Sequence, residues 1–286
     1  QRYRDSDACR RDKAFWAQQR ADLPPPASLS AAPLPGRAAS TDIWRLKLTA
    51  DRHAFSRLAA ASDDVQRADL ALALAALWLG RLCGRSDYAA GYIFMRRLGS
   101  AALTATGPVL NVLPLAVTIH PQETLSALAT RLAGQLKKMR RHQRYDAEQI
   151  VRDGGRAAGD EPLFGPVFNV KVFDYRLDMP GTMATTHTLA TGPVNDLELA
   201  LFPDESGGLT VEVLANRQRY GEEELKRHAA RLEAMLAQFA ANPALPCGAV
   251  DLVSAGEYRR LAEINATAKE VEATTLIEQI GRASCR

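Results

Sequence analysis

The sequence has little cysteine, and its cysteines lie far apart. Its 286 residues include four of them, Cys9, Cys83, Cys247 and Cys285, with no C-x-x-C pair and no histidine pair nearby. This spacing argues against a structural zinc site and against a disulfide framework. The first residues are polar and charged, so no signal peptide is visible, and the longest apolar run, Leu70–Gly80, is too short to cross a bilayer. We therefore expect a protein of the reducing cytoplasm without a membrane span.

The sequence also lacks an excess of charge of one sign. It has 36 basic and 33 acidic residues, for a net charge of +3. Nucleic-acid binding usually requires a clustered basic face. The pairs Lys137–Lys138 and Arg140–Arg141 fall on a helical pattern, where they indicate a solvated helix face. We expect no nucleic-acid partner.

A complete catalytic motif is missing too. The five histidines are isolated from one another: His53, His120, His142, His187 and His228. No H-E-x-x-H, G-x-S-x-G, P-loop or G-x-G-x-x-G pattern occurs. These absences exclude the common metalloprotease, serine hydrolase, P-loop and dinucleotide-binding signatures from this chain, and we predict no metal site.

Helical and strand patterns alternate irregularly along the chain. Helices are predicted at 6–21, from Asp51, and at 66–83, 122–142, 146–152 and 222–241. Strands are predicted at 43–48, 88–95, 109–118, 166–175, 196–203 and 208–216. We expect Pro114 to interrupt its strand, Gly207–Gly208 to form a hairpin turn, and Arg11, Asp12 and Lys13 to point outward. The pattern favours an α+β fold, a mixed sheet with flanking helices.

Four segments carry motifs that occur together in one family. They read V-L-N-V-L-P-L at 109–115, H-Q-R-Y-D-A-E at 142–148, E-P-L-F-G-P-V-F-N at 161–169 and N-D-L at 195–197. In this order they resemble the F-V-N-T-L-P-L, H-Q-x-Y-P-F-E, N-P-L-F-x-x-x-F-N and F-D-L motifs of nonribosomal peptide synthetase condensation domains. The sequence departs from the family at Val112, where threonine is usual, and at Asp146–Ala147, which replace Pro-Phe. The resemblance covers nearly the whole chain.

The resemblance implies a chloramphenicol-acetyltransferase-like subdomain, one of two that enclose a reaction tunnel. The structural motif positions are then Pro114, His142, Gln143, Tyr145, Glu148, Pro162 and Phe164. The candidates for polar groups of the tunnel wall are Asn111, Asn169 and Asp196. For Asn111 we favour a structural role, satisfying buried backbone groups. For Asp196 we favour holding a loop or pairing with an arginine, and for Asn169 both roles stay open. His142 is expected to fix a helix end rather than act as a base.

The resemblance also implies a reaction. Condensation domains form amides between acyl groups that carrier domains deliver on phosphopantetheine arms. The stretches Leu70–Gly99 and Leu189–Phe202 look most like the serine-using member of the enterobactin siderophore assembly line. This implies a 2,3-dihydroxybenzoyl donor on an aryl carrier protein, a serine acceptor on a peptidyl carrier, and an adenylation domain in the same protein.

The family's H-H-x-x-x-D-G motif is absent from this chain, so we assign no catalytic residue and expect the chain alone to be inactive. One alternative is a non-catalytic half-domain that docks carrier or adenylation domains. Another is a sibling acyltransferase, such as an epimerisation domain.

The resemblance predicts three regions. Residues 1–252 correspond to the C-terminal half of a condensation domain, and residues 253–279 to the start of a linker to an adenylation domain. We interpret residues 280–286 as a tail that is not native to the protein, so Cys285 carries no functional weight.

Overall fold

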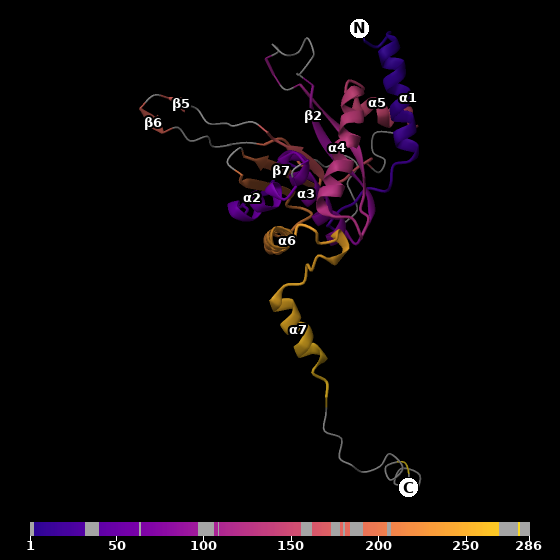
Figure 1. The fold of residues 1–286 in the computed structure, drawn as a ribbon. Helices are drawn as coiled ribbons and strands as arrows, with labels where there is room; N and C mark the ends of the chain where they lie inside the picture. Colours follow the sequence, from indigo (N-terminus) through magenta and orange to yellow (C-terminus); the bar gives the residue numbers. More distant parts are fainter. Residues whose placement is uncertain are drawn as a thin grey trace. The chain divides into compact units, whose positions relative to one another are not determined.

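The computed structural model describes residues 3–31, 40–62, 64–96, 106–107, 109–155, 162–172, 178–179, 181–183, 191–204, 207–268 and 280. The chain divides into two compact units, residues 1–251 and 252–286. The first unit contains the main sheet and the helices that pack on it (Figure 1).

The main sheet is mixed, as predicted. Its order is β1-β8-β7-β4-β2-β3. The strands are β1 (Ile43–Thr49), β2 (Asp87–Met95), β3 (Leu110–Thr118), β4 (Val167–Val170), β7 (Leu197–Pro203) and β8 (Leu209–Asn216). The β2–β4 and β4–β7 pairs are parallel and the other pairs are antiparallel. A separate small pair, β5 (Asp178–Met179) with β6 (Thr182–Met183), was not predicted.

The helices of the first unit match the predicted ones. They are α1 (Asp7–Ala21), α2 (Arg52–Ala60), α3 (Arg67–Cys83), α4 (Leu125–Arg141), α5 (Ala147–Asp153) and α6 (Glu222–Ala241). Side-chain caps explain several starts, because the hydroxyls of Ser6 and Thr124 and the carboxylate of Asp51 each accept from a free backbone N–H of the first turn. The starts of α1 and α2 agree with the predicted ones to within one residue, whereas α4 begins three residues after the predicted start at 122.

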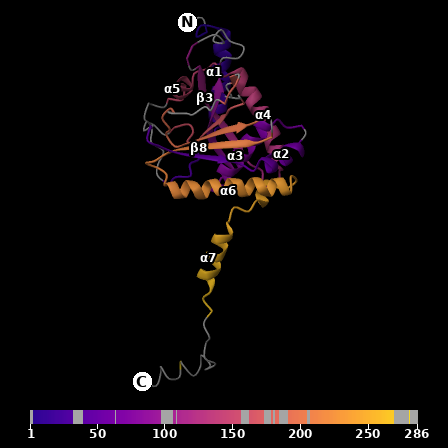
Figure 2. The ribbon, with the colours of Figure 1, turned by 90° about the vertical axis from the view of Figure 1, so that its left-hand side faces the viewer.

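Helix α3 forms the centre of the core. Its residues Leu70–Gly80 are all buried, as the continuous apolar run predicts. The Tyr88 hydroxyl of β2 donates to the Ala76 carbonyl at 2.6 Å, and Trp78 Nε1 donates to the His228 carbonyl of α6 at 2.9 Å. These bonds join the sheet, α3 and α6, and Figure 2 shows α6 running along the lower side of the sheet.

The prediction that Pro114 interrupts its strand is wrong. Strand β3 runs unbroken from Leu110 to Thr118, with Pro114 opposite Gly91 of β2. β3 is an edge strand, where a residue without an N–H group can face outward without breaking a ladder bond. Gly91 is required here, since a Cβ atom at this position would lie 2.7 Å from the Phe164 ring.

The outward orientation predicted for Asp12 is also wrong. Asp12 is only 5% exposed and lies one helical turn before Trp16, on the same buried face of α1. Its carboxylate accepts from the Tyr3 hydroxyl and lies 2.8 Å from His142 Nδ1. A buried carboxylate with such partners is tolerated. Arg11 and Lys13 are exposed as predicted.

The second unit contains a helix that we did not predict. Helix α7 (Ala255–Asn265) has no buried residue and lies in the stretch 253–279 interpreted as a linker. The boundaries at 252 and 279 stay predictions, and the tail 280–286 lies outside the described residues except for Ile280. Among the described residues, no helix has both the length and the apolarity to cross a membrane.

Candidate functional site

The two faces of the main sheet differ in burial. The strand register places Tyr92, Phe168 and Leu199 on the face toward α3, and all three are buried. The alternate residues point to the opposite face. On that face Ala89, Gly91, Ala200 and Leu214 are buried, but seven residues are only half-buried: Ile93, Val112, Val167, Asn169, Glu198, Thr210 and Glu212. We call this set the open face.

Asn169 and Glu198 form a polar pair at the centre of the open face. They lie on the neighbouring parallel strands β4 and β7, and Asn169 Nδ2 donates to Glu198 Oε1 at 2.7 Å. Farther along the same face, Arg45 Nη2 lies 3.3 Å from Glu212 Oε2. The amide and carboxylate oxygens of the pair can accept hydrogen bonds from an amine or a hydroxyl. The arrangement can therefore orient a reacting group, but the pair includes no histidine base.

Asn111 lies on the other face of the sheet. It is 6% exposed and stands opposite Phe94 in the β2–β3 register. Its Nδ2 donates to the carbonyls of Gln143 at 3.1 Å and Tyr145 at 2.7 Å, and its Oδ1 accepts from the Ala147 N–H at 3.3 Å. The side chain thus holds the turn between α4 and α5 on β3, the structural role that we favoured.

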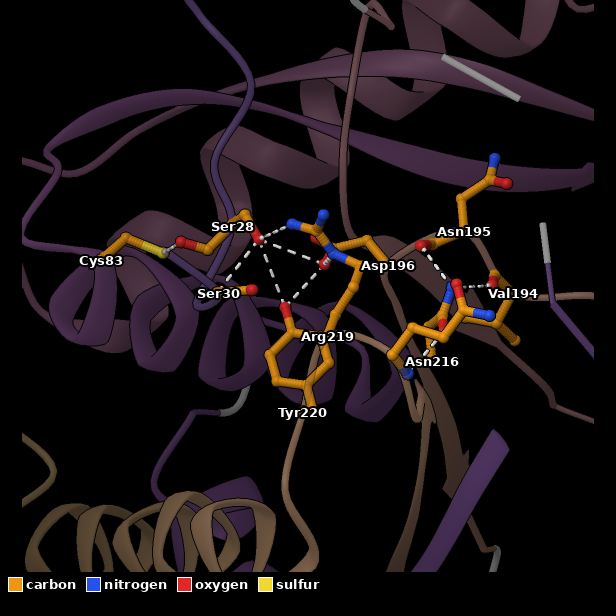
Figure 3. A network of polar contacts seen from close by, with 10 residues as sticks. Ser28, Ser30, Cys83, Val194, Asn195, Asp196, Asn216, Arg219 and Tyr220 are labelled. Carbon is orange, nitrogen blue, oxygen red and sulfur yellow. Dashed lines mark hydrogen bonds and ion pairs between the residues drawn. The ribbon is translucent and has the colours of Figure 1, made fainter. Parts of the chain in front are cut away.

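Asp196 belongs to a buried polar network ahead of β7 (Figure 3). Its Oδ1 lies 2.9 Å from Arg219 Nε and accepts from the hydroxyls of Tyr220 at 2.7 Å and Ser28 at 3.1 Å. Burial, and then the Asp196 carboxylate, raise the pKa of Tyr220 far above its ordinary value, so the phenol stays a donor. The arginine partner expected for Asp196 is therefore present. The network ties the segment around Ser28 to the starts of β7 and α6.

The structure does not bring the three tunnel candidates together. Asn169 lies on the open face, Asn111 on the opposite face, and Asp196 in the buried network. Our sequence reasoning missed Glu198, although a signal was present. In L-E-L-A-L, the strict alternation sets Glu198 on the face opposite the leucines.

His142 joins α1 to the end of α4. It is the C-cap residue of α4, and its Nδ1 lies 2.8 Å from Asp12 Oδ1. Its ring stacks on Phe15 with the centroids 4.1 Å apart, and its carbonyl accepts from Trp16 Nε1 at 2.9 Å. These contacts agree with the expected role at a helix end.

The remaining motif residues differ in burial and in their contacts. The Tyr145 hydroxyl donates to Asp153, and burial followed by this carboxylate raises the pKa of Tyr145. Phe164 packs against Gly91, whereas Pro162 is half-buried. The Glu148 side chain is 84% exposed and lies 3.9 Å from Arg152. Within the described ranges, no group of acidic, histidine or cysteine side chains could hold a metal ion.

Comparison with known sequences shows similarity to an enterobactin synthase component and to a vanchrobactin synthetase. The chain is 71% identical over 276 residues to enterobactin synthase component F of Escherichia coli K12, covering 96% of this chain and 21% of that protein. It is 36% identical over 261 residues to vanchrobactin synthetase VabF of Vibrio anguillarum, covering 91% and 9%. The chain thus spans about a fifth, or less, of the length of these relatives.

Comparison with solved structures gives the same family. The first condensation domain of the calcium-dependent antibiotic synthetase matches with a TM-score of 0.77 and 27% identity, over 88% of this chain and 55% of that one. A starter condensation domain of rhizomide synthetase, in complex with C8-CoA and Leu-SNAC, matches with a TM-score of 0.76 and 29% identity, over 88% and 57%. The family model named "Condensation domain" matches residues 1–262. The chain therefore belongs to the condensation-domain family.

Proposed function

We propose that the protein to which this chain belongs forms an amide between a carrier-bound 2,3-dihydroxybenzoyl group and carrier-bound serine, in the biosynthesis of an enterobactin-type siderophore. The observation that carries this proposal is the 71% identity to enterobactin synthase component F, which extends over 96% of the chain. A cytoplasmic location is part of the proposal, because the separated cysteines suit a reducing compartment.

The reaction is an acyl transfer from sulfur to nitrogen. The seryl amine attacks the aryl thioester carbonyl, the C–N bond forms, and the C–S bond breaks. The proton lost by nitrogen is matched by one gained by the departing pantetheine thiolate. Phosphopantetheine arms of an aryl carrier protein and of a peptidyl carrier deliver the two thioesters, and the adenylation domain of the same protein loads serine.

In this proposal the open face forms part of the wall of the reaction tunnel. Asn169 and Glu198 orient the reacting groups by hydrogen bonding. Asn111 and Asp196 act behind the wall: Asn111 holds the turn between α4 and α5 on β3, and Asp196 ties the segment around Ser28 to the starts of β7 and α6. A general base for the amine is expected from the H-H-x-x-x-D-G motif of the family, which this chain does not contain.

The test is reconstitution. The chain is fused to a half-domain from a relative that carries the H-H-x-x-x-D-G motif, and amide formation is followed with aryl-loaded and seryl-loaded carriers. The chain alone should give no product, whereas the fusion should turn over. Glu198→Gln and Asn169→Ala should each lower kcat/KM roughly tenfold or more, the effect of losing a hydrogen bond that orients a reactant. Lys138→Gln, on the exposed side of α4, is the matched control and should have no effect.

A different outcome would favour the second candidate function. If the folded fusion binds carriers or the adenylation domain but forms no amide, the chain is better described as a non-catalytic half-domain that docks them. Amide formation by the chain alone would contradict the assignment of the base to the missing motif.

A further inference from the structure

A basic cavity lies where the start of α1 meets α5 and the end of β2. Its volume is about 470 Å³, and its lining includes six basic residues and one acidic residue, Asp146. The basic residues are Arg4, Arg10, Lys13, Arg96, Arg144 and Arg152. We call this the basic cavity. Neither Asn169 nor Glu198 lines it, so it is distinct from the polar pair of the open face.

Four carboxylates beside the lining already have partners in the chain, and two of them, Asp7 and Glu148, pair with Arg10 and Arg152. Asp153 accepts from the Tyr145 hydroxyl and from Gln149 Nε2 at 2.8 Å, and lies 3.4 Å from Lys13 Nζ. Asp12 accepts from the Tyr3 hydroxyl and contacts His142. Lys13 offsets part of the charge of Asp153, and the hydrogen bonds turn oxygens of both carboxylates toward donors of the chain.

Two guanidinium groups remain outside these pairings. Among the described residues, the ion pairs include Arg10, Lys13 and Arg152, but neither Arg4 nor Arg144. Arg144 is held in place nevertheless: its Cζ lies 4.4 Å from the centroid of the Tyr3 ring, and its carbonyl accepts from Arg96 Nη2 at 3.1 Å. A guanidinium fixed by an aromatic ring is preorganised to bind an anion.

The shape and the charge together indicate the ligand. The planar guanidinium fork matches the oxygens of a phosphate group, and several cations around one concave surface strengthen the attraction. A cavity of about 470 Å³ falls in the size range of small-molecule sites. A site for another protein would be a larger and flatter surface. We propose that the basic cavity binds the phosphate group of a small phosphate-bearing molecule, either a phosphate ester or a diphosphate.

Two sources could supply this chemistry. One is the phosphopantetheine arm of a carrier, a source that rests on the proposed function. The other is a free diphosphate, which is independent of it. Because the test below measures binding without amide formation, failure of the proposed function does not affect its result.

Calorimetry on the full chain uses three probes: 4′-phosphopantetheine, inorganic pyrophosphate, and pantetheine without phosphate. At least one phosphate compound should bind, and pantetheine should not. Arg144→Gln and Arg4→Gln should each weaken binding roughly tenfold, because one charge-assisted hydrogen-bond donor is lost. Lys138→Gln removes one positive charge from the exposed side of α4 and should leave the Kd unchanged. Tighter binding of 4′-phosphopantetheine points to the arm, and tighter binding of pyrophosphate points to a free diphosphate.

Cys9 provides a second readout, since it is a half-buried free thiol in the lining of the cavity. A bound phosphate compound should slow the alkylation of Cys9 by neutral iodoacetamide, measured by peptide mass mapping. The protection should be lost in Arg144→Gln. Cys83 and Cys247 serve as internal references for slow alkylation, because burial raises the pKa of their thiols to about 11 and about 12.

Several results would overturn the proposal. These are no binding of either phosphate compound, equal binding of pantetheine, an equal effect of Lys138→Gln, or no protection of Cys9 at saturation. Protection of Cys9 by a carrier protein without its arm, but by no phosphate compound, would identify a protein-docking surface instead.

Discussion

Arg219 and Asp196 form an ion pair that is almost fully withdrawn from solvent, with Nε 2.9 Å from Oδ1 and side-chain exposures of 4% and 0%. Removing one partner of such a pair leaves an uncompensated buried charge. Asp196→Asn should therefore lower the free energy of unfolding by about 3–5 kcal/mol, measured by urea denaturation.

The matched control for this variant is an exposed pair. Arg217 Nε lies 3.3 Å from Asp42 Oδ1, with side-chain exposures of 44% and 68%. Asp42→Asn should change the free energy of unfolding by at most about 1 kcal/mol. Equal losses for the two variants would contradict a structural role specific to the Asp196 network.

Asn111 offers a second test of the buried polar contacts behind the open face. Asn111→Ala leaves two carbonyls and one N–H without their partner and should lower the free energy of unfolding by about 2–4 kcal/mol. Asn195→Ala, at an exposed asparagine, should have little effect. If thermal unfolding of Asn111→Ala matches that of the parent chain, the turn between α4 and α5 does not depend on this amide.

Alanine substitutions at Gly91 and Gly134 should have opposite effects on stability, because only Gly91 lies against Phe164. A Cβ atom at Gly91 would lie 2.7 Å from the Phe164 ring, whereas one at Gly134 would meet nothing within 4 Å. Gly91→Ala should destabilise the chain by about 1–3 kcal/mol. Gly134→Ala, in helix α4, should stabilise it by up to about 1 kcal/mol. Adding Phe164→Leu to Gly91→Ala should restore part of the loss, and the absence of any rescue would count against the predicted overlap.

His228 predicts a pH dependence of stability. Burial lowers its pKa, although Glu224 opposes the shift, so the folded chain keeps this imidazole neutral to lower pH than the unfolded chain does. The unfolded state then binds more protons below its own pKa of about 6.5, and stability falls as the pH drops through that value. His228→Gln should weaken this dependence between about pH 7.5 and 5.5. The exposed His53→Gln is the control, and identical pH profiles for the parent chain and His228→Gln would refute the prediction.

Local signals explain which helices could be predicted. Ser6 and Asp51 provide side-chain caps, and their helices begin at the next residue, as predicted. Thr124 caps α4, whose start at Leu125 lies three residues after the predicted one at 122. Helix α7 carries such a signal as well, because Ser254 and Glu257 form a capping box. We did not predict this helix. It buries no residue, so its sequence has no apolar face of the kind that indicates a helix packed on a core.

The errors depend on contacts between distant parts of the chain. The burial of Asp12 requires His142, 130 residues away, and no local pattern around α1 indicates that partner. The continuity of β3 through Pro114 depends on the strand lying at the sheet edge, and this is a property of the whole topology.

In the candidate site, too, single residues could be proposed from local sequence, whereas their contacts could not. Asn169 could be proposed from a family motif, and Glu198 could have been proposed from the alternation of its strand. Their pairing across β4 and β7 could not, because parallel neighbours are joined through connections whose register the sequence does not reveal.

The central claim is that this chain supplies half of an amide-forming condensation domain. The most direct measurement is the intact mass of the seryl carrier after incubation with the aryl-loaded carrier and the reconstituted fusion. Our account predicts that the seryl carrier gains one dihydroxybenzoyl group with the fusion and none with the chain alone. An unmodified seryl carrier in the presence of a folded fusion with both carriers loaded would contradict it.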